Sequence, residues 1–181
     1  RPYKERGKGD CMAAVKKPYA AAVCGVKNSG KTTLLEKLVK ELIRRGYRVA
    51  VVKHDGHEFQ ADVKGTDTFR MQEAGAYGTC IFSGSKWMAV KQEPQVSLDT
   101  LFALFEEADV ILAEGLKDSA LPKLEVVRKG ISSESVCNRE NLLALVTDMD
   151  LQLPGIPSLG LEEVGRCADL LEREMYKKTE R

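Results

Sequence analysis

The amino-acid sequence predicts an α/β fold, in which a doubly wound, mostly parallel sheet is flanked by helices. Short apolar runs, of the kind that buried parallel strands need, alternate along the chain with segments whose apolar residues recur at helical spacing. A glycine-rich segment connects the first of these runs to the first helical segment. Sheets of this class bind ligands at the carboxyl ends of their strands, so functional residues are expected directly after each predicted strand.

The first 17 residues differ in composition from the rest of the chain. Basic residues outnumber acidic ones there, and the apolar residues follow no period. Such a composition favours a disordered tail over a basic docking arm. We therefore expect a tail over residues 1–17 and a single domain over residues 18–181, a length that suits one hydrophobic core.

The domain is expected to begin with a strand, a loop and a helix. Tyr19–Cys24 is an apolar run that fits a buried strand. The next segment, Gly25–Thr32, reads GVKNSGKT and matches the phosphate-binding pattern G-x-x-x-x-G-K-[ST] in full. Apolar residues from Leu34 to Ile43 then recur on one helical face, and Gly46 is placed to end that helix. This order predicts a P-loop NTPase fold.

Each fixed position of the P-loop has a chemical reason. Gly25 and Gly30 let backbone N–H groups turn inward and form an anion-binding nest. Lys31 is placed to reach the β- and γ-phosphate oxygens, and the Thr32 hydroxyl is placed to bind Mg²⁺. The dipole of the following helix adds positive potential at the same point. We expect the protein to bind a nucleoside triphosphate together with Mg²⁺.

Further strands and helices follow in alternation. Thr66 or Asp67 is available as the N-cap of a short helix, and Ser97 starts another. Lys123–Lys129 alternates less cleanly, which we interpret as an edge strand. The expected elements are, in order, a strand over 47–53, a helix over 65–74, strands over 77–83 and 86–91 joined as a hairpin, a helix from 97, a strand over 109–114, the edge strand, a strand over 142–146 and a terminal helix from 161 to about 178.

Two acidic residues follow predicted strands and are candidates for Mg²⁺ binding and catalysis. Glu114 ends the apolar run that begins at Asp109, as a Walker-B acid does, and can hold Mg²⁺ through water. Asp55 follows the second strand and can hold a Mg²⁺-bound water or orient the attacking water. His54 and His57 flank it, but structural zinc needs four N or S ligands and no cysteine pair is near. Ordinary polar-loop packing is the alternative for both histidines.

A third acid, Asp148, is the candidate for recognition of the base. It follows Thr147, directly after the predicted strand over 142–146. Guanine presents two adjacent donors that one carboxylate accepts together, whereas adenine presents an acceptor beside a donor. The lysine that guanine-binding proteins usually carry two residues earlier is absent, because Val146 occupies that position. The alternative is that Asp148 is part of a simple turn. If its carboxylate binds the base, the expected nucleotide is GTP.

Composition excludes several other classes of function. The net charge of +1 gives no field of one sign for nucleic acid or an anionic membrane surface. No apolar run approaches the ~20 residues of a membrane span. The five cysteines include no C-x-x-C pair, which favours a reducing, cytoplasmic location. Cys24 and Cys80 lie in strand-like apolar runs, where a free cysteine is expected to be buried.

Taken together, the motifs resemble the MobB family, small GTP-binding adapter proteins of molybdopterin-guanine dinucleotide biosynthesis. The resemblance extends from about Tyr19 to Asp148. A P-loop alone is common to very many proteins, but KHDGH followed by GTDTFR and EGLKD…PKLEVVR is far more selective. The segments that carry the resemblance are GVKNSGKTTLLEKLVKEL, RVAVVKHDGHEF, DVKGTDTFRMQEAGA, ADVILAEGLKDSALPKLEVVR and LALVTD.

The resemblance implies a protein that binds GTP, hydrolyses it weakly and forms a homodimer. It also implies an adapter that assists a MobA-like guanylyltransferase, with molybdopterin-carrying proteins as further candidate partners. By position it implies metal binding by Thr32, Asp55 and Glu114, and base binding by Thr147 and Asp148. Arg70 and Lys117 fall within family motifs without an assigned role. The phosphate-binding residues that it implies are Gly25, Lys27, Asn28, Ser29, Gly30, Lys31, Thr32 and Thr33.

Two other functions use the same architecture. A metallochaperone-type GTPase would be expected to carry a His-rich or C-x-x-C metal store, and two histidines are few for that role. A P-loop small-molecule kinase would need a basic lid, for which Arg128, Lys129 and Arg139 are the candidates. The sequence favours a switch-like binding module with at most slow, Mg²⁺-dependent GTP hydrolysis, because it contains no identifiable arginine finger or activating glutamine.

Overall fold

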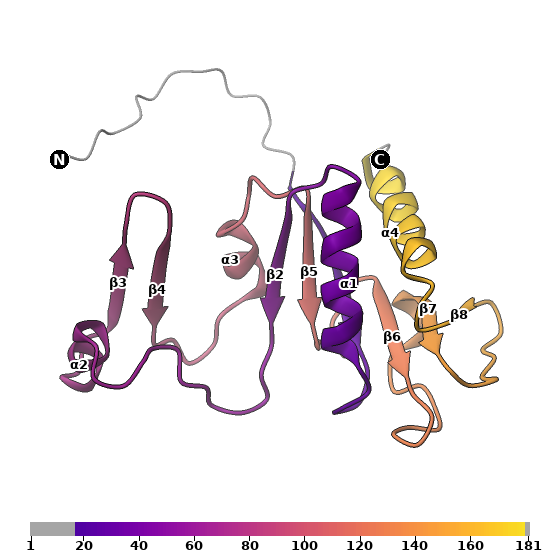
Figure 1. Cartoon of the computed structure of the whole chain (residues 1–181), viewed down its shortest axis with the longest axis horizontal. Helices are drawn as coiled ribbons and strands as arrows, with labels where there is room; N and C mark the ends of the chain where they lie inside the picture. The colour runs from indigo at the N-terminus through magenta and orange to yellow at the C-terminus, as the bar shows by residue number, and fades with distance from the viewer. Residues whose placement is uncertain (1–16, 180–181) are drawn as a thin grey trace.

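The computed structural model describes residues 17–179 of the chain (Figure 1). The predicted basic tail therefore lies outside the described residues, except for Lys17. No described helix combines the length and hydropathy that a membrane crossing requires.

A six-stranded sheet forms the centre of the molecule, and every pair of neighbouring strands in it is parallel. The predicted strands are confirmed to within a few residues, and one short strand near the end of the chain is additional. β1 lies in the middle of this sheet, next to β5 and β6. The strands follow the order β2 (Val49–Lys53), β5 (Val110–Glu114), β1 (Tyr19–Cys24), β6 (Lys123–Val127), β7 (Leu142–Thr147) and β8 (Ser158–Leu159).

Helices α1 (Lys31–Arg44) and α4 (Val164–Thr179) lie together over one face of this sheet (Figure 1). Both are amphipathic, and their apolar residues join those of the strands in one core cluster. Leu38 and Leu42 of α1 are fully buried in it, with Leu171 of α4. Gly46, with φ of 94°, follows the C-cap of α1, as a helix-ending glycine should.

Two short helices lie outside that core. α2 (Asp67–Glu73) begins at Thr66, whose hydroxyl accepts a hydrogen bond from the Phe69 N–H, and α3 (Leu98–Ala103) begins at Ser97. Both predicted N-caps are therefore confirmed, Thr66 rather than Asp67 in the first case. Neither helix contains a fully buried residue. A single 3₁₀ turn, Arg139–Asn141, precedes β7.

The predicted edge strand is wrong in its position. β6 lies inside the sheet between β1 and β7, and all five of its residues are buried. Its residues alternate because the strand is buried on both faces of the sheet. Leu124 and Val126 join the core under α1 and α4, while Lys123 and Glu125 lie on the other face. Buried polar side chains therefore gave the strand the pattern of a half-exposed one.

A separate hairpin forms the outlying part of the molecule, beside α2 (Figure 1). β3 (Gly78–Phe82) and β4 (Trp87–Lys91) pair antiparallel with each other and with no described strand of the main sheet. This confirms the predicted hairpin. Cys80, however, is exposed rather than buried, as are most residues of the two strands.

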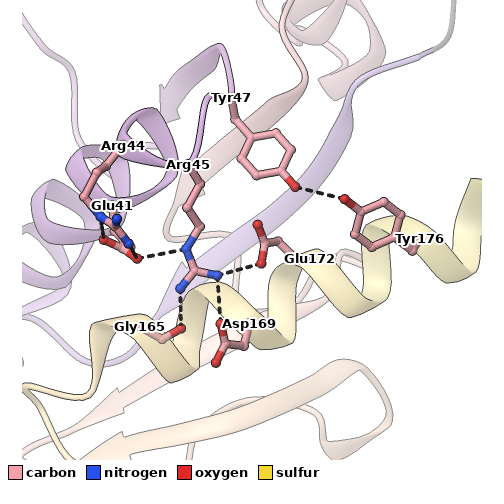
Figure 2. A network of polar contacts seen from close by, with 8 residues as sticks. All are labelled: Glu41, Arg44, Arg45, Tyr47, Gly165, Asp169, Glu172 and Tyr176. Carbon is pink, nitrogen blue, oxygen red and sulfur yellow. Dashed lines mark hydrogen bonds and ion pairs between the residues drawn. The ribbon is translucent and has the colours of Figure 1, made fainter.

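Arg45, directly after α1, connects this helix to α4 (Figure 2). Its guanidinium group donates to Glu41 on its own helix at 2.8 Å, to Asp169 at 2.7 Å and to Glu172 at 2.6 Å. A further bond reaches the carbonyl oxygen of Gly165 at 3.0 Å. The side chain is only 18% exposed, so these bonds are partly shielded from water and join the two helices above the core.

Arg45→Ala should lower the free energy of unfolding by about 1–3 kcal/mol, because it leaves three carboxylates without their common partner. Arg44→Ala is the matched control, since the exposed Arg44 pairs with Glu41 of its own helix and bridges nothing. Urea unfolding followed by circular dichroism measures both. Equal losses in the two variants would contradict a role for Arg45 in joining the helices.

Candidate functional site

The P-loop connects the carboxyl end of β1 to the first turn of α1, and its two glycines have backbone conformations that other residues rarely adopt. Gly25 has φ of 137° and Gly30 has φ of 101°. A Cβ atom on Gly25 would lie 2.5 Å from the carbonyl oxygen of Val126 and 2.7 Å from the Ser29 hydroxyl. The loop therefore passes so close to β6 that only glycine fits at its first position.

The backbone N–H groups at the start of α1 are available to bind an anion. Gly30 is the N-cap residue and supplies no side-chain cap, so the first N–H groups of the helix have no side-chain partner of that kind. Lys31 is half-buried, and its Nζ donates to the carbonyl oxygen of Val26, within the same loop, at 2.8 Å. A helix N-terminus with a lysine folded over its loop is an arrangement suited to phosphate. Ser29 is fully buried, whereas Lys27, Asn28 and Thr33 are exposed.

Glu114, the acid predicted at the end of β5, contacts the P-loop residue Thr32. Thr32 Oγ1 lies 3.1 Å from both carboxylate oxygens of Glu114. The contact follows from the sheet, because β5 pairs with β1 and sets Glu114 beside Val23, close to the start of the loop. A hydroxyl and a carboxylate side by side are oxygen ligands of the type that Mg²⁺ takes, with its remaining positions left to water and phosphate.

Asp55 lies at the same edge of the sheet, just after β2. Lys53 is in register with Glu114, and the His54 N–H donates to the Glu114 carbonyl oxygen at 3.1 Å. The exposed Asp55 carboxylate accepts from the His57 N–H at 3.3 Å. Among the contacts described, none joins Asp55 to Thr32 or Glu114. Within residues 17–179, no three His, Cys, Asp or Glu side chains gather as a metal-binding group.

The candidate base-binding acid lies at the carboxyl end of β7, two strands away from β1. Asp148 is exposed, and its Oδ1 accepts from the backbone N–H of Lys129 at 2.7 Å. The buried Thr147 accepts from the Met149 N–H at 3.1 Å. Asp148 is thus held between the ends of β6 and β7, and its other carboxylate oxygen has no partner among the described hydrogen bonds.

The two motif residues without a predicted role lie on the surface. Arg70 is in α2, where its guanidinium group is 3.8 Å from the Asp67 carboxylate. Lys117 is exposed in the loop after β5, next to Leu116, which has φ of 58°. The structure therefore brings the P-loop, Thr32 and Glu114 together and sets Asp55 and Asp148 along the same edge, while Arg70 stays in the outlying part.

Sequence reasoning missed a group of buried polar residues on the face of the sheet opposite α1. Lys123 is fully buried and donates to the carbonyl oxygens of Ser119 and Leu121. Glu125 is fully buried and accepts from the hydroxyl of Ser135 and the N–H of Val136. Lys123 is held by the loop directly before β6 and Glu125 by the segment after it, and the strand-like pattern of 123–127 gives no sign of either bond.

Cys24 and Cys137 are packed together beside these residues. Cys24, the residue before the P-loop, donates to the carbonyl oxygen of Gly115 at 2.8 Å. The neighbouring Cys24 thiol, together with burial, raises the pKa of Cys137 well above its usual range. Both thiols are inside the protein, as predicted for Cys24.

One family of known proteins matches most of this chain. The model of the family described as "MobB: Molybdopterin guanine dinucleotide synthesis protein B" matches residues 20–148. The chain is 35% identical over 157 residues to the "molybdopterin-guanine dinucleotide biosynthesis adapter protein" of Haemophilus influenzae, which covers 85% of this chain and 88% of that protein. It is 32% identical over 158 residues to the protein of the same description from Escherichia coli, covering 83% and 89%.

Solved structures show the same fold. A MobB protein homolog from Bacillus stearothermophilus aligns with a TM-score of 0.63 and 26% identity, covering 87% of this chain and 98% of that one. MobB from Bacillus subtilis aligns with a TM-score of 0.67 and 24% identity, covering 84% and 97%. The P-loop NTPase fold predicted from the sequence is therefore confirmed.

The close approach of the P-loop to β6 can be tested with a pair of alanine substitutions. Gly25 and Gly155 both have positive φ, so alanine strains the backbone at each, but a Cβ on Gly155 would meet nothing within 4 Å. Gly155→Ala should lower the free energy of unfolding by about 1–2 kcal/mol. Gly25→Ala should cost clearly more, since its Cβ collides with the Val126 carbonyl. Urea unfolding of both variants measures this; equal losses would mean that the loop can move away from β6.

Proposed function

Because the chain belongs to the MobB family, we propose that it is a cytoplasmic, GTP-binding adapter protein of molybdopterin-guanine dinucleotide biosynthesis. We infer that residues 18–181 form its single nucleotide-binding domain. The observation that carries the proposal is the contact of Thr32 in the P-loop with Glu114 at the end of β5. A phosphate-binding loop, a Mg²⁺-binding hydroxyl and a Walker-B acid in one place are the components of a nucleoside triphosphate site.

In this proposal the P-loop residues hold the phosphates. The N–H groups at the start of α1 donate to phosphate oxygens, and Lys31 exchanges its bond to the Val26 carbonyl for the β- and γ-phosphates. When bound, Mg²⁺ neutralises charge on those phosphates. Thr32 would hold that ion directly, Glu114 would hold it through water, and Asp55 at the same edge would orient a further water. The sequence contains no identifiable arginine finger or activating glutamine, so GTP hydrolysis is expected to be slow.

Asp148 would select the base. Each oxygen of a carboxylate can accept more than one hydrogen bond, so the bond from the Lys129 N–H leaves capacity for both donors of guanine. The same bond fixes the direction of the side chain, which lowers the entropy lost when a base binds. Thr147 would support this position from the strand end, where its hydroxyl holds the following turn.

The surface offered to partners would be the outlying hairpin. Phe82 and Trp87 are opposite each other in register and are 69% and 59% exposed, while Ile81 and Met88 are exposed on the other face. A two-stranded hairpin is marginally stable by itself, so apolar side chains on both of its faces favour burial by another chain. We propose a homodimer that uses this hairpin and presents two GTP sites to a MobA-like guanylyltransferase.

GTP should bind at least ~10-fold more tightly than ATP in isothermal titration with Mg²⁺ present. Asp148→Asn should reduce this preference without abolishing phosphate binding, because the amide cannot accept both guanine donors. Asp150→Asn, a change of the same charge two residues later and also exposed, is the control and should leave the preference unchanged. Equal GTP and ATP affinities in the wild type would refute the base assignment, and failure to capture a MobA-like enzyme in a pulldown would refute the adapter role.

Trp87→Glu should convert the dimer to a monomer that still binds GTP, because a buried, unpaired charge at the hairpin opposes association. Ile43→Glu is the matched control: Ile43 is an equally exposed apolar residue on α1, away from the hairpin. Light scattering at micromolar concentration measures the mass of each. A wild-type protein that is monomeric at every concentration, or a Trp87→Glu variant that stays dimeric, would contradict this interface.

A further inference from the structure

Arg128 lies beside the P-loop on the side away from Glu114. β1 is between β5 and β6 in the sheet, so the loop that leaves β1 has Glu114 at the end of one neighbour and Arg128 just beyond the end of the other. Leu124 and Val126 of β6 face α1 in the core. Side chains alternate along a strand, so Arg128 continues the same row towards the start of α1.

The guanidinium group reaches the loop itself. Its Nη1 lies 3.6 Å from the position of a Cβ atom on Gly30, the residue directly before Lys31. Within residues 17–179, Arg128 forms no ion pair, whereas Arg44, Arg45 and Arg166 each pair with carboxylates. A guanidinium group over a phosphate-binding loop, without a carboxylate to neutralise it, keeps its full charge and its donors for an anion.

The backbone of Arg128 is fixed by a turn. Its carbonyl oxygen accepts from the N–H groups of Ile131 and Ser132 at 3.0 Å each, and its own N–H donates to the Ser132 hydroxyl at 3.3 Å. The next N–H, that of Lys129, holds Asp148. The segment thus stands between the P-loop and the acid proposed for the base, so the Arg128 side chain starts from a fixed point within the site.

We propose that Arg128 is a phosphate-binding residue of the nucleotide site, which donates from the β6 side of the P-loop while Lys31 donates from α1. This inference rests on the proposed nucleotide binding and adds a second cation to it. A planar guanidinium group presents two parallel donors to phosphate oxygens, and such charge-assisted bonds are stronger than neutral ones. Their target is common to all nucleoside triphosphates, so Arg128 contributes affinity but does not select the base.

Isothermal titration of GTP and of ATP, both with Mg²⁺, tests the assignment. Arg128→Ala should weaken both nucleotides by the same factor, about 10-fold or more, and Arg128→Lys should retain part of the affinity because it keeps the charge. Arg139→Ala is the matched control, since this exposed arginine precedes β7 at the opposite edge of the sheet and should change neither affinity. Arg128 is exposed, so its replacement opens no cavity, and circular dichroism verifies the fold.

The outcomes separate this inference from the proposed function. Unchanged affinity in Arg128→Ala, with a wild type that binds, overturns the role of Arg128 alone. A change in the ratio of GTP to ATP affinity overturns the phosphate assignment, because it would mean that Arg128 contacts the base. A wild-type protein that binds neither nucleotide overturns the proposed function and this inference with it.

Discussion

β1 forms parallel backbone hydrogen bonds with β5 on one side and with β6 on the other, and this pairing sets what lies beside the P-loop at the candidate site. The P-loop leaves the carboxyl end of β1, so whatever ends the two neighbouring strands lies beside it. Glu114 comes from β5 and contacts Thr32. β6 passes so close that its Val126 carbonyl leaves room only for glycine at position 25. Without the pairing to β5 the P-loop would lose its contact with Glu114, and without the pairing to β6 it would lose its close approach to Val126.

The two faces of the sheet hold this arrangement by different means. Under α1 and α4 the contact is apolar, and Arg45 joins the helices above it with several charged partners (Figure 2). On the opposite face, two fully buried charges of β6 bind loops: Lys123 holds the loop after β5, and Glu125 holds the segment at 135–136. Such charges are costly to bury, but once paired they allow few alternative positions for the loops they bind. The loop after Glu114 is therefore tied to β6, and Arg128 directly follows that strand.

The hairpin of β3 and β4 has a different physical character. It has no core of its own, and its apolar side chains on both faces remain exposed in the single chain. Two strands alone bury little apolar area, and this is why we propose the hairpin as the surface that another protein covers. The proposed nucleotide site and the proposed partner surface are thus separate parts of the molecule, connected by the segment from His54 to Asp67 that begins at the sheet edge.

The sequence by itself determined the elements whose signal is local. The spacing of Leu34, Leu38 and Leu42 predicted α1, the hydroxyls of Thr66 and Ser97 predicted two N-caps, and the glycine pattern of Gly25–Thr32 predicted the loop between β1 and α1. These features depend on the helical or strand period and on bonds between near neighbours in the chain, which a single sequence displays directly.

Only the tertiary structure decided which strands are neighbours. Lys123–Val127 has the alternation of an edge strand, yet it is fully buried, because the loops directly before and after it supply partners for Lys123 and Glu125 and strands β1 and β7 flank it. The position of Arg128 beside Gly30 depends on that same pairing of β6 with β1. The exposure of Cys80 depends on the hairpin lying outside the main sheet. β1 and β6 pair although they are about 100 residues apart, and the residue pattern of neither strand shows which strand is its neighbour. The sequence therefore shows the residues of the candidate site but not the strand order that brings them together.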